Sequence, residues 1–296
     1  MHKYMRAIGF SKFENRKKLQ ELLTEVVVNS DRRAYTVNQE KSFLGEFCKD
    51  FAPGLGIAVC GEFDQEEKFT YEYYFPYLTG TGITSYEDVS VERHADKESY
   101  AGVCDDIKVG ISLIFYLKNK IPYITAQTME KLPVKGTTLT LSALSVSGIV
   151  MLPIQKDKEQ IERGKQASAN RNTLIAAARK GDENAIETLT LDDMDMYTTI
   201  SRRIQSEDIF SLVDTYFMPY GVECDQYSIL GEIMAMRLVT NQITKVQIHV
   251  FSICCNELVF DVCINIADLY GEPQVGRRFK GVVWLQGQIN FPENAI

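Results

Sequence analysis

Stretches of alternating apolar and polar residues fill the first half of the chain, which is the pattern of half-buried β-strands. The segments with this pattern, rich in β-branched and aromatic residues, are residues 56–63, 68–77, 86–94, 99–104, 109–117 and 137–154. The polar residues 64–67 predict a hairpin turn between the first two. Residues 4–10 predict a short strand, residues 11–29 a helix that starts with a Ser11–Glu14 capping box, and residues 41–51 a second short helix. We therefore expect a largely antiparallel α+β domain over residues 1–155.

The pattern changes to that of helices after Pro153. Residues 156–204 are rich in Ala, Glu, Lys and Arg, and Gly181 is placed to end one helix before the next begins. Thr190 and Asp193 have the spacing of a capping box that opens another helix, and Ser206 caps a further one. Residues 156–221 are thus predicted to form a helical connector.

Strand patterns return in the last part of the chain, at residues 227–240, 243–252, 257–266 and 277–291. Short polar turns between consecutive strands predict an antiparallel meander over residues 222–296, and a small closed barrel is the alternative. The overall expectation is an α+β protein with a mainly antiparallel N-terminal sheet domain, a helical connector, and a C-terminal antiparallel meander or small barrel.

The net charge of the chain limits the classes of partner that we expect. The net charge is −8, which argues against a general affinity for nucleic acid or for an anionic membrane. The connector is divided, with a net charge of +4 over residues 156–180 and −7 over residues 181–221. These two stretches are expected either to pair with each other or to form solvated helix faces.

The compartment is predicted from two further features. The N-terminal residues lack the apolar core of a signal peptide, and the apolar run over residues 111–117 is far shorter than the roughly 20 residues that span a membrane. The 7 cysteines are an odd number without regular spacing. We expect reduced thiols and a cytoplasmic location without membrane contact.

Three segments carry a resemblance to a known family. They are residues 5–11 (MRAIGFS), residues 178–183 (ARKGDE) and residues 271–287, which include GEPQVGRRFKG and WLQG. Together they resemble an uncharacterised family of anaerobic Gram-positive bacteria, over nearly the whole chain. The resemblance implies a bacterial cytoplasmic protein of about this length and assigns no activity and no functional residues.

The last predicted strand offers the clearest candidate binding surface. By alternation, Phe279, Val283 and Leu285 lie on one face, and a mixed set of residues lies on the other. That mixed set contains the candidate binding residues Arg278, Lys280, Trp284 and Gln286. Cations beside an aromatic ring suit an anionic sugar, a nucleotide or a partner chain. The competing interpretation is a solvated strand face whose Trp284 packs under the connector.

Chemical signatures are weak elsewhere. Glu92, His94 and Asp96 alternate on one predicted strand face and are the candidates for acid–base or metal chemistry, but the favoured interpretation is a polar edge strand with a hydrogen-bonded histidine. No other residues complete a recognisable metal site, and the glycine motifs near residues 54, 80 and 136 depart from nucleotide-binding patterns. We therefore predict no cofactor and no metal.

Three functional hypotheses remain open. The favoured one is a cytoplasmic binding or scaffold protein that contacts a protein or a small-molecule ligand. The first alternative is an enzyme with an unrecognised site in the cleft between the two domains, which predicts a pocket where titratable groups with shifted pKa values converge. The second alternative is a single-stranded nucleic-acid binder that uses the C-terminal β domain, and the acidic balance of that region counts against it. The oligomeric state is left open.

Overall fold

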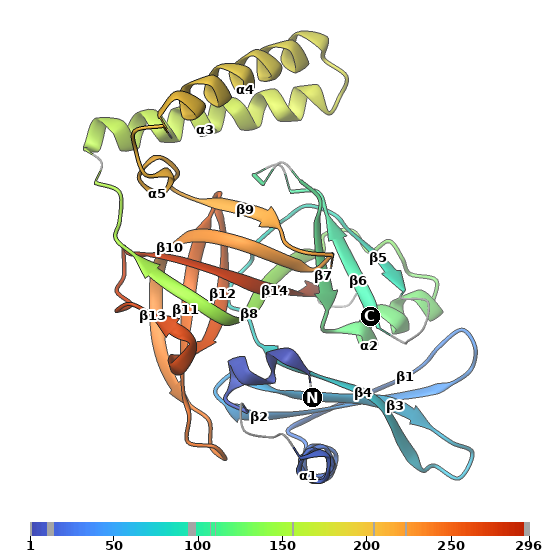
Figure 1. Ribbon diagram of the computed structural model, residues 1–296. Coiled ribbons are helices and arrows are strands. Elements are labelled where there is room, and N and C mark those ends of the chain that lie inside the picture. The colour runs from blue at the N-terminus through green and yellow to red at the C-terminus, as the bar shows by residue number, and fades with distance from the viewer. Residues whose placement is uncertain are drawn as a thin grey trace.

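A four-stranded antiparallel sheet, a ten-stranded mixed sheet and a helical hairpin make up the protein (Figure 1). The computed structural model describes residues 2–10, 15–93, 99–106, 108–109, 111–155, 157–203, 205–222 and 224–292. The predicted α+β class is confirmed, because helices and mainly antiparallel strands alternate in blocks along the chain.

The N-terminal sheet consists of four strands in sequence order: β1 (Arg32–Val37), β2 (Phe43–Ala52), β3 (Leu55–Phe63) and β4 (Phe69–Leu78). The predicted hairpin between β3 and β4 is confirmed. The helix predicted over residues 41–51 is wrong, because this segment forms β2 between β1 and β3. The apolar residues Leu44 and Phe47 have a spacing that fits a helix. The segment is nevertheless a strand, because β1 and β3 pair with its two edges.

Two helical segments precede this sheet: η1 (Lys3–Ile8) and α1 (Arg16–Val28). The strand predicted at residues 4–10 is wrong, because η1 is a 3-10 helix that ends at Gly9, with φ 95°. Consecutive residues such as Tyr4 and Met5 are both buried there, so the strand pattern of alternation is absent. The Asn15 side chain caps α1 by accepting from the Lys17 amide at 2.9 Å, and the predicted Ser11–Glu14 capping box lies outside the described residues.

The C-terminal strands close into the small barrel that was one of the two predicted forms. Its five strands are β8 (Thr138–Met151), β10 (Gln226–Thr240), β11 (Gln247–Cys255), β12 (Leu258–Asn265) and β14 (Arg278–Asn290). Strands β10, β11 and β12 form the expected antiparallel meander, and β14 returns to pair with β10. Strand β8 completes the ring by pairing parallel with β12 and antiparallel with β14.

The division predicted at residue 155 does not coincide with a boundary between sheets. Strand β8 precedes it in the sequence and lies between β12 and β14, which follow it. The remaining strands extend the same sheet: β5 (Val89–Arg93), β6 (Tyr100–Cys104), β7 (Leu113–Leu117), β9 (Tyr216–Pro219) and β13 (Leu269–Tyr270). Helix α2 (Lys120–Thr128) follows β7 directly and contacts β1.

Two apolar cores share the strands of the barrel. The first includes Phe279, Val283 and Leu285 of β14 and extends from the barrel strands to β6, β7 and α2. The second lies between the outer face of the barrel and the N-terminal sheet, and it includes Trp284. Strand β14 is therefore covered on both faces, a position in which polar side chains need internal hydrogen-bond partners.

The connector between β8 and β9 folds mainly as a hairpin of two long helices, α3 (Lys158–Ala178) and α4 (Glu183–Arg203), followed by the short α5 (Ile209–Leu212). Gly181 has φ 88° at the turn between them, as predicted for a helix stop. No helix begins at Thr190, because α4 continues through it, and Asp193 instead lies 2.9 Å from Arg171 of α3. Asp208, rather than Ser206, caps α5.

Candidate functional site: a polar pocket between the two sheets

The mixed face of β14 is buried at Arg278, Trp284 and Gln286 and half-buried at Lys280. Arg278 is 7% exposed, and its guanidinium donates to the backbone carbonyls of Leu152, Val213 and Phe210 at 2.8–3.0 Å. The Lys280 ammonium lies 4.0 Å from the centre of the Phe210 ring. These two candidates therefore hold the segment around α5 against the barrel.

The other two candidates on β14 join the barrel to the N-terminal part of the chain. Trp284 is 5% exposed, stacks on Tyr4 with ring centres 5.4 Å apart, and donates from Nε1 to Asp225 at 2.6 Å. Gln286 is 0% exposed; its Nε2 donates to the Pro76 carbonyl at 2.8 Å and its Oε1 accepts from the Leu78 amide. The Trp284 ring is thus not available to stack on a nucleobase or a sugar.

The predicted acidic and histidine group is only partly described. Glu92 lies on β5 and pairs with Ala101 of β6. Its side chain is exposed and lies on the opposite face of the strand from Val91 and Arg93. His94 and Asp96 lie outside the described residues. Within the described part of the chain, no three His, Cys, Asp or Glu side chains gather as a metal site would require.

A cavity of about 80 Å³ lies where the N-terminal sheet meets β14 and the segment between β7 and α2; we call it the inter-sheet pocket. All four strands of the N-terminal sheet reach it. Its lining residues are Arg32, Glu46, Cys48, Ala58, Phe75, Tyr77, Thr79, Lys118, Asn119 and Gln288. Pockets for drug-sized ligands measure roughly 300–1,000 Å³, so this cavity suits a much smaller molecule.

Lys118 contributes a buried amine to this pocket. It follows β7 directly and is 9% exposed. Its Nζ donates to the Leu78 carbonyl at 2.5 Å and to the Ser142 hydroxyl at 2.9 Å, both uncharged acceptors. Burial lowers the pKa of this amine to about 7, and the Arg32 guanidinium acts in the same direction. The amine therefore changes its charge near neutral pH.

Glu46 also lines the pocket and is in contact with two thiols. Its carboxyl accepts from the Cys48 thiol at 3.8 Å and from the Cys60 thiol at 3.6 Å. Burial raises the pKa of Glu46, while the nearby Lys120 opposes this shift. Burial also raises the pKa of both thiols, so they are protonated and poorly nucleophilic.

Arg32 supplies the second positive charge. Its Nη2 donates to the Tyr77 hydroxyl at 2.9 Å, and its guanidinium lies over the Tyr77 ring at 5.3 Å. The Tyr77 hydroxyl in turn donates to Asp50, which lies 3.5 Å from Arg32. This chain of contacts fixes the orientation of a guanidinium whose side chain is still 57% exposed.

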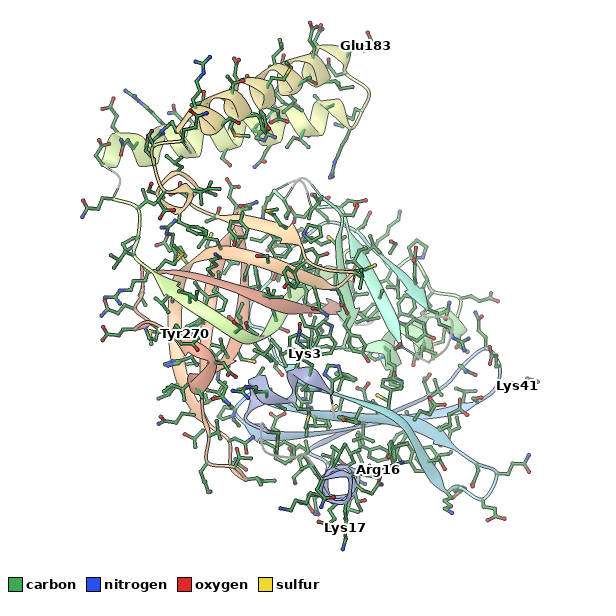
Figure 2. The ribbon with its side chains drawn as sticks, viewed as in Figure 1. Lys3, Arg16, Lys17, Lys41, Glu183 and Tyr270 are labelled. Atoms are coloured by element: carbon green, nitrogen blue, oxygen red, sulfur yellow. The ribbon has the colours of Figure 1, made fainter. Side chains whose placement is uncertain are left out.

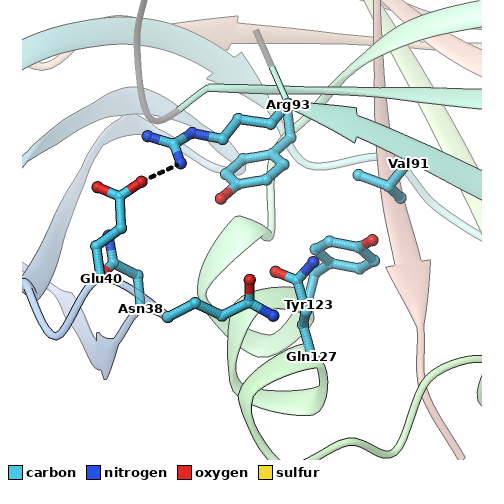
Figure 3. Close-up of a pocket in the computed structure, with 8 residues that line it drawn as sticks. Asn38, Glu40, Val91, Arg93, Tyr123 and Gln127 are labelled. Carbon is cyan, nitrogen blue, oxygen red and sulfur yellow. Dashed lines mark hydrogen bonds and ion pairs between the residues drawn. The ribbon is translucent and has the colours of Figure 1, made fainter. Parts of the chain in front are cut away.

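A second cavity, of about 130 Å³, lies between the β1–β2 turn, β5 and α2 (Figure 3). The side chains of Asn38, Tyr123 and Gln127 face it, together with the ion pair of Arg93 with Glu40 at 3.0 Å. The charges of this cavity neutralise each other. The inter-sheet pocket therefore has the more unusual chemistry of the two.

Sequence reasoning did not identify Lys118 or Glu46 as functional residues. Lys118 ends the apolar run over residues 111–117, and a lysine at that place usually marks the exposed end of a strand. Glu46 sits in the segment predicted to be a helix. The one usable signal was the expectation that a site between the two β-rich parts would collect titratable groups with shifted pKa values.

The fold and the pocket define an α+β protein in which a small barrel and an antiparallel sheet enclose a polar cavity. The chain belongs to the family described as "Domain of unknown function, E. rectale Gene description (DUF3881)", whose model matches residues 5–287. This confirms the resemblance to an uncharacterised family over nearly the whole chain, and the family name points to a bacterial origin. No curated protein and no solved structure matches the chain. Among the described residues, no helix is long and apolar enough to cross a membrane.

Proposed function

We propose that the protein binds a small anionic molecule, carrying a carboxylate or a phosphate group, in the inter-sheet pocket. The observation that carries this proposal is the placement of Arg32 and Lys118 on one cavity, where, among the described residues, the buried amine donates to the uncharged Leu78 and Ser142 oxygens alone. An ammonium group has three donors, so a ligand oxygen can accept the third.

The electrostatics of the pocket favour this class of ligand. The Asp261 carboxylate, which would favour the charged form of Lys118, already accepts from the Thr81 amide and hydroxyl at 2.9 and 2.8 Å. The raised pKa of Glu46 favours its neutral form, so its charge opposes an anion less than an exposed carboxylate would. A bound anion would supply the missing counter-charge and raise the pKa of Lys118.

A calorimetric titration with inorganic phosphate, acetate, pyruvate and succinate tests the proposal on the full chain. We expect at least one anion to bind, and Arg32→Gln to weaken that binding roughly tenfold or more, as expected for loss of a charged partner. Arg33→Gln is the matched control, because Arg33 occupies the next position of β1 and bonds Ser30 and Val28 instead. The absence of binding by any anion, or equal losses in the two variants, would contradict the proposal.

The pH dependence adds an independent check. Since Lys118 has a pKa of about 7, the affinity for the anion should fall as the pH rises above neutrality. Lys118→Met should remove this dependence along with most of the affinity. A binding constant that is unchanged between neutral and mildly alkaline pH would exclude Lys118 from the binding site.

A second candidate function is catalysis by Lys118 itself. An amine with a pKa of about 7 is substantially unprotonated at neutral pH and can attack a carbonyl carbon. The attack forms a C=N bond and releases the carbonyl oxygen as water. Borohydride added with pyruvate would reduce that bond, and mass spectrometry would find a stable adduct on Lys118. An adduct-free Lys118 beside demonstrated pyruvate binding would leave binding alone as the function.

The site of action that we propose is the cytoplasm. All 7 cysteines are free thiols, including Cys48 and Cys60 on the neighbouring strands β2 and β3. Free thiols are typical of reducing compartments. Fractionation of cells that express the tagged chain tests this assignment, and recovery in a membrane or secreted fraction would overturn it.

A further inference from the structure

Helix α4 is exposed along most of the length that the structure describes. In the hairpin, α4 lies on the side of α3 that faces away from the barrel (Figure 1). Glu183, the first residue of α4, is at the far tip of the hairpin (Figure 2). Along the described part of α4, Ala185 is the one buried residue. Helix α4 is therefore covered only along its α3 side.

Helix α3 separates α4 from the rest of the molecule and is itself held to the barrel. Asn172 donates to Glu257 in the β11–β12 turn at 3.3 Å, and Arg179 donates to the Asp105 carbonyl at 2.9 Å. Arg171 joins the two helices through its ion pair with Asp193. The outer face of α4 is thus presented on an anchored support.

This outer face has an apolar centre. Leu191, Met194 and Tyr197 are 57%, 63% and 75% exposed. They follow one another in steps of three residues, so they lie within about 120° of arc on a helix of 3.6 residues per turn. Large apolar side chains clustered on one exposed helix face mark a contact surface more often than isolated ones do.

The two ends of the same face carry opposite charges. Glu187 lies two turns before Met194 on the same line of the helix, and Arg202 lies about two turns after it. Both side chains are exposed, and neither forms an ion pair within the described part of the chain. Arg203, by contrast, is paired with Glu207 at 2.6 Å. The face therefore runs from an acidic end through an apolar centre to a basic end.

We infer that α4 is the interface of a homodimer, in which the outer faces of two α4 helices pack antiparallel about a two-fold axis at Met194. A two-fold axis brings a surface patch against a copy of itself, so the patch must be self-complementary. Antiparallel packing reverses one copy, which places Glu187 beside Arg202 of the second copy and Leu191 beside Tyr197 of the second copy. Two pairs of Glu187 with Arg202 then form, one at each end of the interface.

The size of this interface sets the strength that we expect. Helix α4 has 21 residues, a length of about 32 Å at 1.5 Å per residue. One helix from each copy buries less than the roughly 1,200–2,000 Å² of standard stable interfaces. The dimer should therefore be in equilibrium with monomer, and its fraction should depend on protein concentration.

Charge reversal tests the antiparallel register. In sedimentation velocity over a range of concentrations, Glu187→Lys and Arg202→Glu should each weaken the dimer roughly tenfold or more, because each brings like charges together. An equimolar mixture of the two variants should associate again, because Lys at position 187 of one chain meets Glu at position 202 of the other. Recovery in the mixture is a result that damage to the fold cannot produce.

Asp192→Lys is the matched control, because it makes the same charge change about 140° around the helix from Glu187. It should leave the dissociation constant within roughly twofold of the original chain. The inference is overturned if the original chain stays monomeric at the highest concentration reached, if both single reversals leave the dimer intact, or if the mixture fails to associate.

Discussion

Strand β14 buries polar side chains, whereas helix α4 exposes apolar ones. Gln286 and Arg278 of β14 are 0% and 7% exposed, whereas Met194 and Tyr197 of α4 are 63% and 75% exposed. Strand β14 is covered by the barrel interior on one face and by the N-terminal part of the chain on the other. Helix α4 packs against α3, and the side chains of its outer face are exposed. The exposed fraction of a side chain in these two elements therefore depends on how many faces of the element other parts of the chain cover, and not on the polarity of its residues.

The buried polar side chains of β14 and the exposed apolar side chains of α4 differ in whether the rest of the chain supplies their contacts. The buried polar groups of β14 each have protein partners, since an unpartnered buried group costs free energy. The exposed apolar side chains of α4 are not covered by another described part of the same chain. We therefore expect substitutions on β14 to change the stability of the monomer and substitutions on α4 to change its association.

The largest effect is expected from Trp284→Ala. The substitution removes a buried indole that contacts Tyr4 and Tyr116, together with the hydrogen bond from its Nε1 to Asp225. The free energy of unfolding should fall by about 3–5 kcal/mol in a urea titration followed by circular dichroism. Tyr197→Ala in dilute protein should change it by no more than about 0.5 kcal/mol. Equal losses in the two variants would mean that α4 is covered as well as β14 is.

The next effect concerns the pH dependence of stability. The pKa of Lys118 falls from 10.5 to about 7 on folding, so the unfolded chain binds an extra proton between these pH values. Stability should therefore rise with pH across that window, by up to about 1.4 kcal/mol per pH unit, and be flat with respect to this group below pH 7.

Lys118→Met should remove that slope, whereas Lys68→Met should keep it, because Lys68 is exposed. Urea titrations at several pH values between 7 and 9 measure the difference. An unchanged slope in Lys118→Met would show that Lys118 keeps an ordinary pKa in the folded chain.

A smaller loss is expected from Gln286→Met. The new side chain has a similar volume but leaves the Pro76 carbonyl and the Leu78 amide without their side-chain partner. Unfolding free energy should fall by about 1–3 kcal/mol. Gln247→Met, at an exposed position of β11, is the control and should be close to neutral. A neutral Gln286→Met would indicate that water replaces the amide between the two sheets.

The smallest effect on stability is expected from Leu191→Ala. Because Leu191 is 57% exposed, dilute protein should lose no more than about 0.5 kcal/mol of unfolding free energy. The same variant should lower the dimer fraction in concentrated protein, as measured by sedimentation velocity. A clear loss of monomer stability instead would place Leu191 in contact with the rest of its own chain.

The sequence predicted strands best where each strand pairs with the strand that follows it in the sequence. The β3–β4 hairpin and the β10–β11–β12 meander were predicted because each strand pairs with its neighbour in the sequence. The segment over residues 41–51 was misassigned because its apolar spacing fits a helix until β1 and β3 bind its two edges.

The candidate sites show the same limit. Arg278, Lys280, Trp284 and Gln286 were correctly placed on one face of a strand, which follows from the two-residue period of the backbone. That this face is covered by the N-terminal sheet, η1 and α5 depends on contacts between residues more than 60 positions apart. The pocket around Lys118 and Arg32 arises from the same docking.

The sequence by itself determined the α+β class, the helical connector, the C-terminal antiparallel meander and the charge division between the two connector helices, because these depend on local periodicity and composition. The tertiary structure decided which faces are buried, that β8 closes the barrel, and that a lysine at the end of a strand becomes a buried amine. The physical reason is that burial and pKa are set by what packs against a residue, and those neighbours come from distant parts of the chain.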